Sequence, residues 1–126
     1  MFSHIMLGAN DIEQSKNFYD AIMAVLGYDK GVIDEKGRCF YISSEGVFAL
    51  TKPINGDAAS AGNGMTIGFN VADPAMGDAW HAAGLANGGT SCEDAPGIRV
   101  AGESKLYLAY LRDPAGNKIC ATHYVK

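Results

Sequence analysis

The same order of secondary-structure signals occurs twice along this chain. Each half begins with an alternating strand pattern, continues with an amphipathic helix and ends with three further strands. The second copy starts about 62 residues after the first, so that Thr66 takes the place of His4. One such unit is too small to bury both faces of its sheet, so the two units must pack together. The repeat therefore predicts an α+β fold in which two βαβββ modules pair into one open, curved mixed sheet, with the helices on its outer face.

Helix and loop signals set the boundaries of the two modules. The first helix is predicted to begin at Asn10 or Asp11, both residue types suited to capping, and the second at the Asp73-Pro74 pair. Between the modules lies a segment rich in small and turn-forming residues. A length of 126 residues fits one domain. We therefore predict a single domain made of module 1 at about 1–52, a linker at 53–63 and module 2 at about 64–126.

The composition disfavours several classes of partner. The net charge is −4 and the isoelectric point about 5.2, so the chain as a whole repels the phosphates of nucleic acids. No apolar stretch approaches the ~20 residues that a membrane helix needs, and the first residues do not resemble a secretion signal. The three cysteines are widely spaced and odd in number, which disfavours a disulfide framework. We expect a cytoplasmic protein whose partner is a small molecule rather than nucleic acid or a membrane.

Three groups of residues carry a resemblance to a known superfamily. One of them, Tyr110–Ile119, contains an Asp-Pro-Ala-Gly-Asn turn between two strand patterns. The other two are His4-Ile5-Met6-Leu7 followed by Asp11-Ile12, Ser15, Phe18-Tyr19 and Leu26-Gly27, and Ala82-Ala83-Gly84-Leu85 followed by Gly88-Gly89. With these motifs the chain resembles the vicinal oxygen chelate superfamily, which includes glyoxalase I, bleomycin-resistance proteins and extradiol dioxygenases. The paired βαβββ fold implied by this resemblance agrees with the repeat.

The resemblance also implies a metal site, which this sequence does not complete. Members bind a divalent metal through four side chains on the first and last strands of each module, and these positions fall on His4, Ala49, Thr66 and Cys120. Ala49 has no donor atom, Thr66 is a poor ligand, and Cys120 stands where the superfamily usually has Glu. Catalytic zinc needs about three protein ligands, and non-haem iron needs two His and a carboxylate. We therefore expect no cofactor and disfavour a bound Zn, Ni, Mn or Fe ion. An unpredicted donor or a neighbouring subunit could still supply the missing ligands.

The candidate binding residues are those expected to face the concave side of the sheet. His4 is the one candidate catalytic residue, because an imidazole can transfer a proton near neutral pH. Arg38 could hold a carboxylate or phosphate, and either Tyr107 or Tyr110 is expected to line the cavity. Gly8 and Gly68 are expected to leave room there. The full set of candidates is His4, Met6, Arg38, Ala49, Thr66, Tyr107 and Cys120.

Two functions of different classes follow from the resemblance. The favoured one is a glyoxalase/bleomycin-resistance-like protein that binds a small organic molecule in its concave cavity, with an incomplete metal site. The alternative is a metal-dependent lyase or isomerase of the lactoylglutathione lyase type, and an extradiol dioxygenase is a weaker third hypothesis. Superfamily members of this size often pair, so we expect a homodimer; the sequence does not decide whether the cavity crosses the subunit interface.

Overall fold

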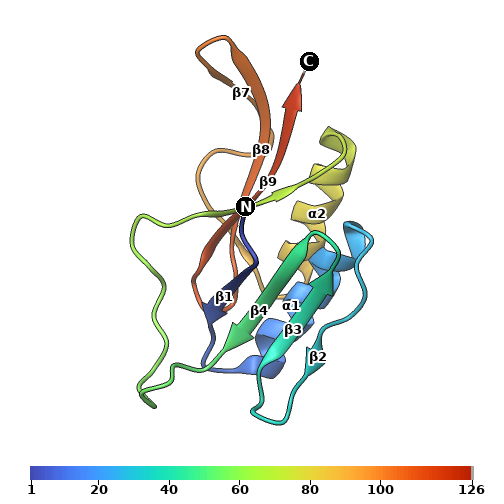
Figure 1. The fold of residues 1–126 in the computed structure, drawn as a ribbon. Helices are drawn as coiled ribbons and strands as arrows, with labels where there is room; N and C mark the ends of the chain where they lie inside the picture. The colour runs from blue at the N-terminus through green and yellow to red at the C-terminus, as the bar shows by residue number, and fades with distance from the viewer. Residues whose placement is uncertain (126) are drawn as a thin grey trace.

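Two modules make up residues 1–125, the part of the chain that the computed structural model describes (Figure 1). The first is βαβββ as predicted, and the second has one further short strand, β6, between the helix and the three predicted strands. Lys126, the last residue of the predicted second module, lies outside the described residues. The α+β class and the open sheets are confirmed. The elements of the first module are β1 (His4–Gly8), α1 (Ile12–Val25), β2 (Val32–Ile33), β3 (Cys39–Ser43) and β4 (Gly46–Thr51). Those of the second are β5 (Ile67–Asn70), α2 (Pro74–Ala86), β6 (Thr90–Ser91), β7 (Gly97–Ala101), β8 (Ser104–Arg112) and β9 (Lys118–Val125).

Hydrogen bonding divides the strands into two open mixed sheets. The first has the order β1-β4-β3-β2 and the second β5-β9-β8-β6, with β7 also pairing with β8. The first strand of each module runs parallel to its last strand, and all other pairs are antiparallel. The registers of the two parallel pairs are equivalent. Met6 stands beside Ala49 in the first sheet, and Gly68, 62 residues after Met6, stands beside Cys120 in the second. The sequence repeat is therefore a repeat of topology and register.

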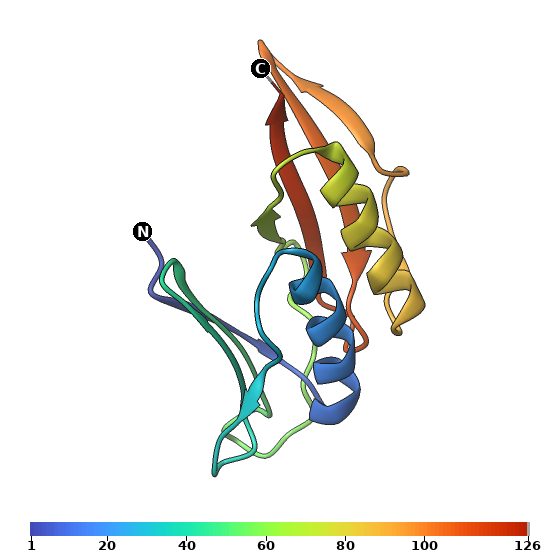
Figure 2. The same cartoon turned by 90° about the vertical axis from the view of Figure 1, so that its right-hand side faces the viewer.

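Both helices begin where the capping residues predict. The Asp11 carboxylate accepts a hydrogen bond from the amide of Gln14 at 3.0 Å, and Asp73 accepts one from Met76 at 2.8 Å. Each helix covers one face of its own sheet, and α1 and α2 lie side by side (Figure 2). The helix-facing side chains of both modules merge into one hydrophobic core. The ring of Phe48 on β4 stands 5.4 Å from that of Phe69 on β5, so the two sheets also meet directly.

A buried polar network fastens the β8–β9 turn of module 2 to module 1. Asp113 is 4% exposed and accepts a hydrogen bond from the Tyr19 hydroxyl of α1 at 2.7 Å. The Asn117 side-chain amide donates both to Asp113 and to the carbonyl of Gly8 at the end of β1, each at 3.0 Å. Burial, followed by the charge of Asp113, raises the pKa of Tyr19 well above its usual value, so the phenol stays a donor. The Asp-Pro-Ala-Gly-Asn motif is therefore a junction between modules as well as a turn.

The start of the second module differs from the sequence prediction. A strand was predicted from Gly64, but β5 begins only at Ile67. Residues Asn63 and Gly64 form a turn, with Gly64 at φ +95°, outside the backbone region of a regular strand. Thr66 consequently lies in the connecting segment and not on β5.

Replacing Asp113 with Asn is predicted to destabilise the fold. The new amide group would place a donor against the Asn117 amide, and the charge-assisted bond from Tyr19 would be lost. We expect the free energy of unfolding to fall by about 1.5–3 kcal/mol, the range for a buried hydrogen bond to a charged group. Urea denaturation followed by circular dichroism measures the change. The matched control is Asp29→Asn, an exposed residue, which should leave the midpoint unchanged; equal effects of the two substitutions would contradict the role of the junction.

Candidate functional site

The structure distributes the predicted site residues over several places. His4 lines one cavity, Met6 and Arg38 a second, and Thr66 a third. Ala49 and Cys120 are buried. Tyr107 packs under α2. The chain therefore does not bring all the candidates around one point, and each place must be considered by its own chemistry.

His4 belongs to a cavity of about 370 Å³ where the first residues of β1 approach β5. Its walls come from both modules, since the β3–β4 hairpin, the end of α1 and strand β5 all contribute. We call it the aromatic pocket, because five aromatic rings line it together with His4: Phe2, Tyr28, Tyr41, Phe48 and Phe69. An aromatic, mostly apolar cavity with a few polar groups is the usual form of a small-molecule site.

Several polar groups of the aromatic pocket already form hydrogen bonds within the chain. The His4 Nδ1 atom lies 2.8 Å from the Ser3 hydroxyl. Tyr28 donates to Glu45 at 2.6 Å, and that hydrogen bond, followed by burial, raises the pKa of the Tyr28 phenol. Tyr41 donates to Asp20 on α1 at 2.7 Å, and burial is the largest cause that raises its pKa. Both phenols stay protonated at neutral pH, so neither serves as a base there.

Met6 and Arg38 lie together in a different cavity, of about 830 Å³. It is formed by the start of α1, the β2–β3 turn and the segment after β4. The Arg38 guanidinium is paired with Asp34 at 2.6 Å and stands over the ring of Phe40 at 5.2 Å. Its hydrogen bond lowers the pKa of Asp34. The predicted carboxylate- or phosphate-holding Arg38 is thus occupied by an internal carboxylate, and it does not share a cavity with His4.

The four positions of the superfamily metal site do not fit a divalent ion. Ala49 is completely buried and offers a methyl group. Cys120 is 6% exposed, and burial raises the pKa of its thiol, so the metal-binding thiolate is disfavoured. Thr66 lines another cavity than His4. Within residues 1–125, no three His, Cys, Asp or Glu side chains come together as a metal-binding group.

The two tyrosines of β8 face opposite sides of the sheet. Tyr107, the predicted binding residue, donates to Asp78 of α2 at 2.5 Å, and its ring fills the space beside Gly77. Its role is therefore to hold α2 against the sheet. Tyr110, the other alternative, stands beside Cys120 on the face away from α2, with the Lys118 ammonium 4.9 Å from its ring centre. Strand alternation predicts that the two side chains lie on opposite faces of the sheet. Only the position of α2 shows which of the two faces is covered by the helix.

The glycines expected to leave room also differ in role. A Cβ on Gly8 would lie 3.0 Å from the Cβ of Ala59, so the linker covers this glycine. Asn10 fixes that contact through hydrogen bonds with the amide and carbonyl of Ala59. Gly68 does border the aromatic pocket, and a Cβ there would make ordinary contact with Cys120. Gly8 therefore makes space for the linker rather than for a ligand.

Sequence reasoning missed most of the aromatic pocket. Tyr28 follows α1, Glu45 lies in the β3–β4 turn, and Phe69 lies on β5. No motif joins them, because they meet only when the two modules pack. Phe48 lies on β4, and the strand pattern there gives no sign of a cavity at that end of the strand.

The chain is thus an α+β protein of two paired modules, with a cavity lined by residues of both. The family model described as the glyoxalase/bleomycin resistance protein/dioxygenase superfamily matches residues 1–121. This chain belongs to that superfamily. No curated protein matches the sequence. No helix within the described residues is both long and apolar enough to cross a membrane.

Solved structures agree with the family assignment. A glyoxalase/bleomycin resistance protein from Albidiferax ferrireducens T118 is 58% identical, with 98% of each chain covered and a TM-score of 0.94. A glyoxalase-related enzyme from Fulvimarina pelagi is 22% identical, covers 97% of this chain and 86% of its own, and has a TM-score of 0.73. A glyoxalase/bleomycin resistance protein/dioxygenase family enzyme from Burkholderia phytofirmans PsJN is 17% identical over 98% of each chain, with a TM-score of 0.76. The last two likenesses show the fold alone.

The three free cysteines are predicted to react at different rates. Burial raises the pKa of the Cys39 and Cys120 thiols, so at pH 8 a smaller share of each is the reactive thiolate, whereas Cys92 is only half-buried. Iodoacetamide should therefore label Cys92 first in the folded protein. Peptide mass spectrometry over time measures the order, and Cys92→Ser should remove the fast phase. Labelling of Cys120 at the same rate as Cys92 would contradict this arrangement.

Proposed function

We propose that this chain binds a small organic molecule, predominantly aromatic or apolar, in the aromatic pocket, with His4 as its polar contact. The observation that carries the proposal is a cavity of about 370 Å³ whose aromatic walls come from both modules. The 58% identical glyoxalase/bleomycin resistance protein supports a role in small-molecule binding. Apolar walls supply affinity by removing ligand surface from water, and one oriented polar group supplies selectivity.

His4 is suited to contact a ligand because one ring nitrogen is held and the other is free to act. When the Ser3 hydroxyl donates to Nδ1, the proton of the neutral ring resides on Nε2. That N–H then donates to a carbonyl, hydroxyl or ether oxygen of the ligand. Since His4 is exposed, its donor reaches a bound molecule without displacing a buried bond.

We propose further that binding needs no resident divalent metal. The missing donor at Ala49 and the protonated thiol at Cys120 support this, because a catalytic metal would keep too few protein ligands. Without a cation or an equivalent donor set, an enolate formed beside a carbonyl lacks its electrostatic stabilisation. Binding is therefore favoured over chemistry of the lactoylglutathione lyase or dioxygenase type. The free cysteines support a cytoplasmic location.

Substitution of His4 is predicted to weaken ligand binding selectively. With 4-hydroxybenzaldehyde as an aromatic carbonyl probe, the dissociation constant should rise roughly tenfold in His4→Ala, the cost of about one hydrogen bond. His4→Gln, which keeps a donor, should recover part of the affinity. Nuclear magnetic resonance titration measures both, with Gly68 and Phe69 amides as reporters. The exposed control Asn55→Ala should not change the affinity.

Two results would overturn this proposal in favour of the enzyme alternative. One is stoichiometric, tight binding of zinc, nickel or manganese that is lost in His4→Ala. The other is turnover of the hemithioacetal of methylglyoxal and glutathione at a rate ordinary for enzymes, roughly 1–10³ per second. Failure of the probe to shift any pocket amide would also reject the aromatic pocket as the binding site.

We propose that the chain forms a homodimer through the face of the first sheet that points away from α1. Tyr41 contacts α1, so its neighbours on β3 point to the opposite face, where Ile42 is 73% exposed and Val32 on β2 is 65% exposed. An apolar sheet face of this kind is stabilised when a second copy covers it. His4 and Ile42 both stand beside Val47, so the proposed interface borders the aromatic pocket.

Light scattering is predicted to give a mass of twice 13.3 kDa for the protein. Ile42→Glu should reduce it to the monomer mass, because a carboxylate buried in an apolar interface is strongly unfavourable. The control Ile54→Glu alters an isoleucine in the linker that is even more exposed, and it should leave the dimer intact. A monomer in the unmodified protein at micromolar concentration, or equal behaviour of the two variants, would reject this interface.

A further inference from the structure

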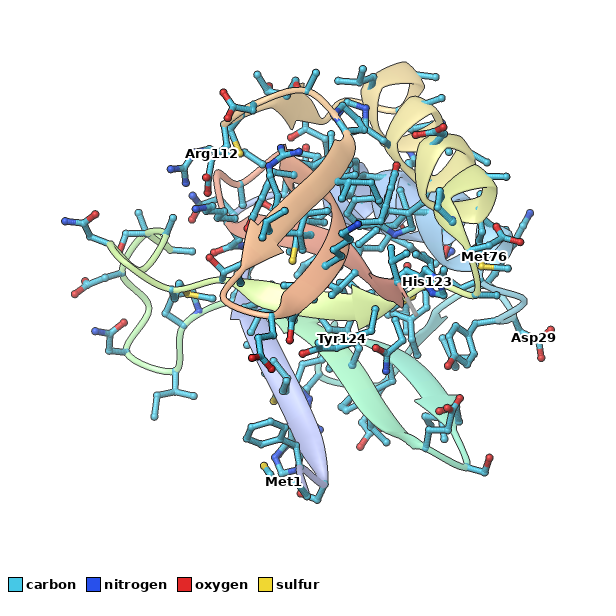
Figure 3. The ribbon with its side chains drawn as sticks, turned by 90° about the horizontal axis from the view of Figure 1, so that it is seen from above. Met1, Asp29, Met76, Arg112, His123 and Tyr124 are labelled. Atoms are coloured by element: carbon cyan, nitrogen blue, oxygen red, sulfur yellow. The ribbon has the colours of Figure 1, made fainter. Side chains whose placement is uncertain are left out.

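Two basic side chains line a third cavity on the concave side of the second sheet. The cavity has a volume of about 370 Å³ and lies between the connecting segment 61–66 and strands β8 and β9. Arg112 at the end of β8 and Lys118 at the start of β9 both face it. Arg112 extends on the side of the molecule where the linker runs (Figure 3). None of these residues lines the aromatic pocket.

The two cations stand directly opposite each other in the sheet. Arg112 and Lys118 are cross-strand partners in the β8–β9 ladder, so their side chains share one face. Like charges in that position repel each other and destabilise a sheet unless an anion lies between them. Within residues 1–125, Arg112 pairs with no carboxylate and donates only to the carbonyl of Gly116, at 2.8 Å. The positive charge is thus only half compensated inside the chain.

The compensating group is a carboxylate from a constrained loop. Glu93, in the loop between β6 and β7, forms an ion pair with Lys118. Glu93 has φ +56° and is the one residue other than glycine with positive φ in the described part of the chain. That conformation is unfavourable for a residue with a Cβ atom. The ion pair therefore shows that a carboxylate fits on Lys118, and that an internal one occupies this place at the cost of backbone strain.

We propose that this cavity is a second ligand site, which binds the oxyanion of a small carboxylic acid or phosphate ester between Arg112 and Lys118. A guanidinium and an ammonium on neighbouring strands match an anion with two or more oxygens. Thr66 and Asn63 line the same cavity, and both residue types carry neutral donors. Gly64 leaves its side of the backbone uncovered, since a Cβ there would meet nothing within 4 Å.

The bound anion takes the place of Glu93 on Lys118. Glu93 then leaves its ion pair, and the loop between β6 and β7 loses the contact that opposes relaxation of its backbone. Lys118 keeps its charge throughout, and its position over the Tyr110 ring needs no change. Ligand and Glu93 therefore compete for Lys118. Removing the charge of Glu93 should accordingly strengthen anion binding at this site.

Nuclear magnetic resonance titration at constant ionic strength tests the site, with sodium phosphate in one arm and sodium succinate in the other. The amides of Gly62, Gly64 and Thr66 should shift saturably, and the stronger arm identifies the preferred oxyanion. Arg112→Gln and Lys118→Gln should each weaken binding roughly tenfold, the value of one charge-assisted hydrogen bond. Glu93→Gln should strengthen it several-fold, by about the worth of one ion pair. The control Lys105→Gln changes an exposed lysine at the far end of β8 and should have no effect.

Several outcomes overturn the proposal. Amide shifts that do not saturate, or that sodium chloride reproduces, would show that anions gather loosely around the charges and do not bind at a specific site. So would equal binding by the Arg112→Gln, Lys118→Gln and Lys105→Gln variants, once circular dichroism shows that each is folded. Weaker binding in Glu93→Gln rejects the competition. His4→Ala should bind both anions normally, so this experiment can fail while the aromatic pocket stands, and the reverse also holds.

Discussion

The carboxylate of Asp113 fixes how the two modules sit relative to each other. It is buried at the end of β8, accepts hydrogen bonds from Tyr19 on α1 and from Asn117, and Asn117 in turn donates to Gly8 on β1. A buried carboxylate is tolerated only when its lone pairs are satisfied, so this network specifies one arrangement of the turn against module 1. The network holds β1 and α1 against the β8–β9 turn. It thereby fixes the separation of β1 and β5, which carry opposite walls of the aromatic pocket.

The sequence predicted the fold well because its signals are local and repeated. Asp11 and Asp73 cap their helices through contacts three residues away, and alternation gives the facing of each strand. A concave cavity was predicted, but not which residues share one, because that depends on which module surfaces meet. Arg38 illustrates the limit: it was a candidate for holding a carboxylate or phosphate of a ligand, but it pairs with Asp34, four residues away.

The surroundings of Gly8 and Thr66 depend on the path of the linker between the two modules. Gly8 lies under Ala59 of the linker, and Thr66 falls in the connecting segment because a turn at Gly64 delays the start of β5. A linker rich in small residues was recognisable in the sequence, but its path over β1 was not. The positions that the superfamily uses for metal ligands are thus affected by linker geometry as well as by the change of residue type.

The two proposed sites depend on different physical terms, and the fold separates them. The aromatic pocket removes apolar surface from water and lies where the modules meet, so its affinity is tied to the Asp113 junction. The Arg112 and Lys118 cavity depends on charge, and its cations lie on a single β8–β9 ladder within one module. Raising the salt concentration should therefore weaken anion binding but leave the aromatic pocket almost unaffected, because screening acts on exposed charges and not on apolar contacts.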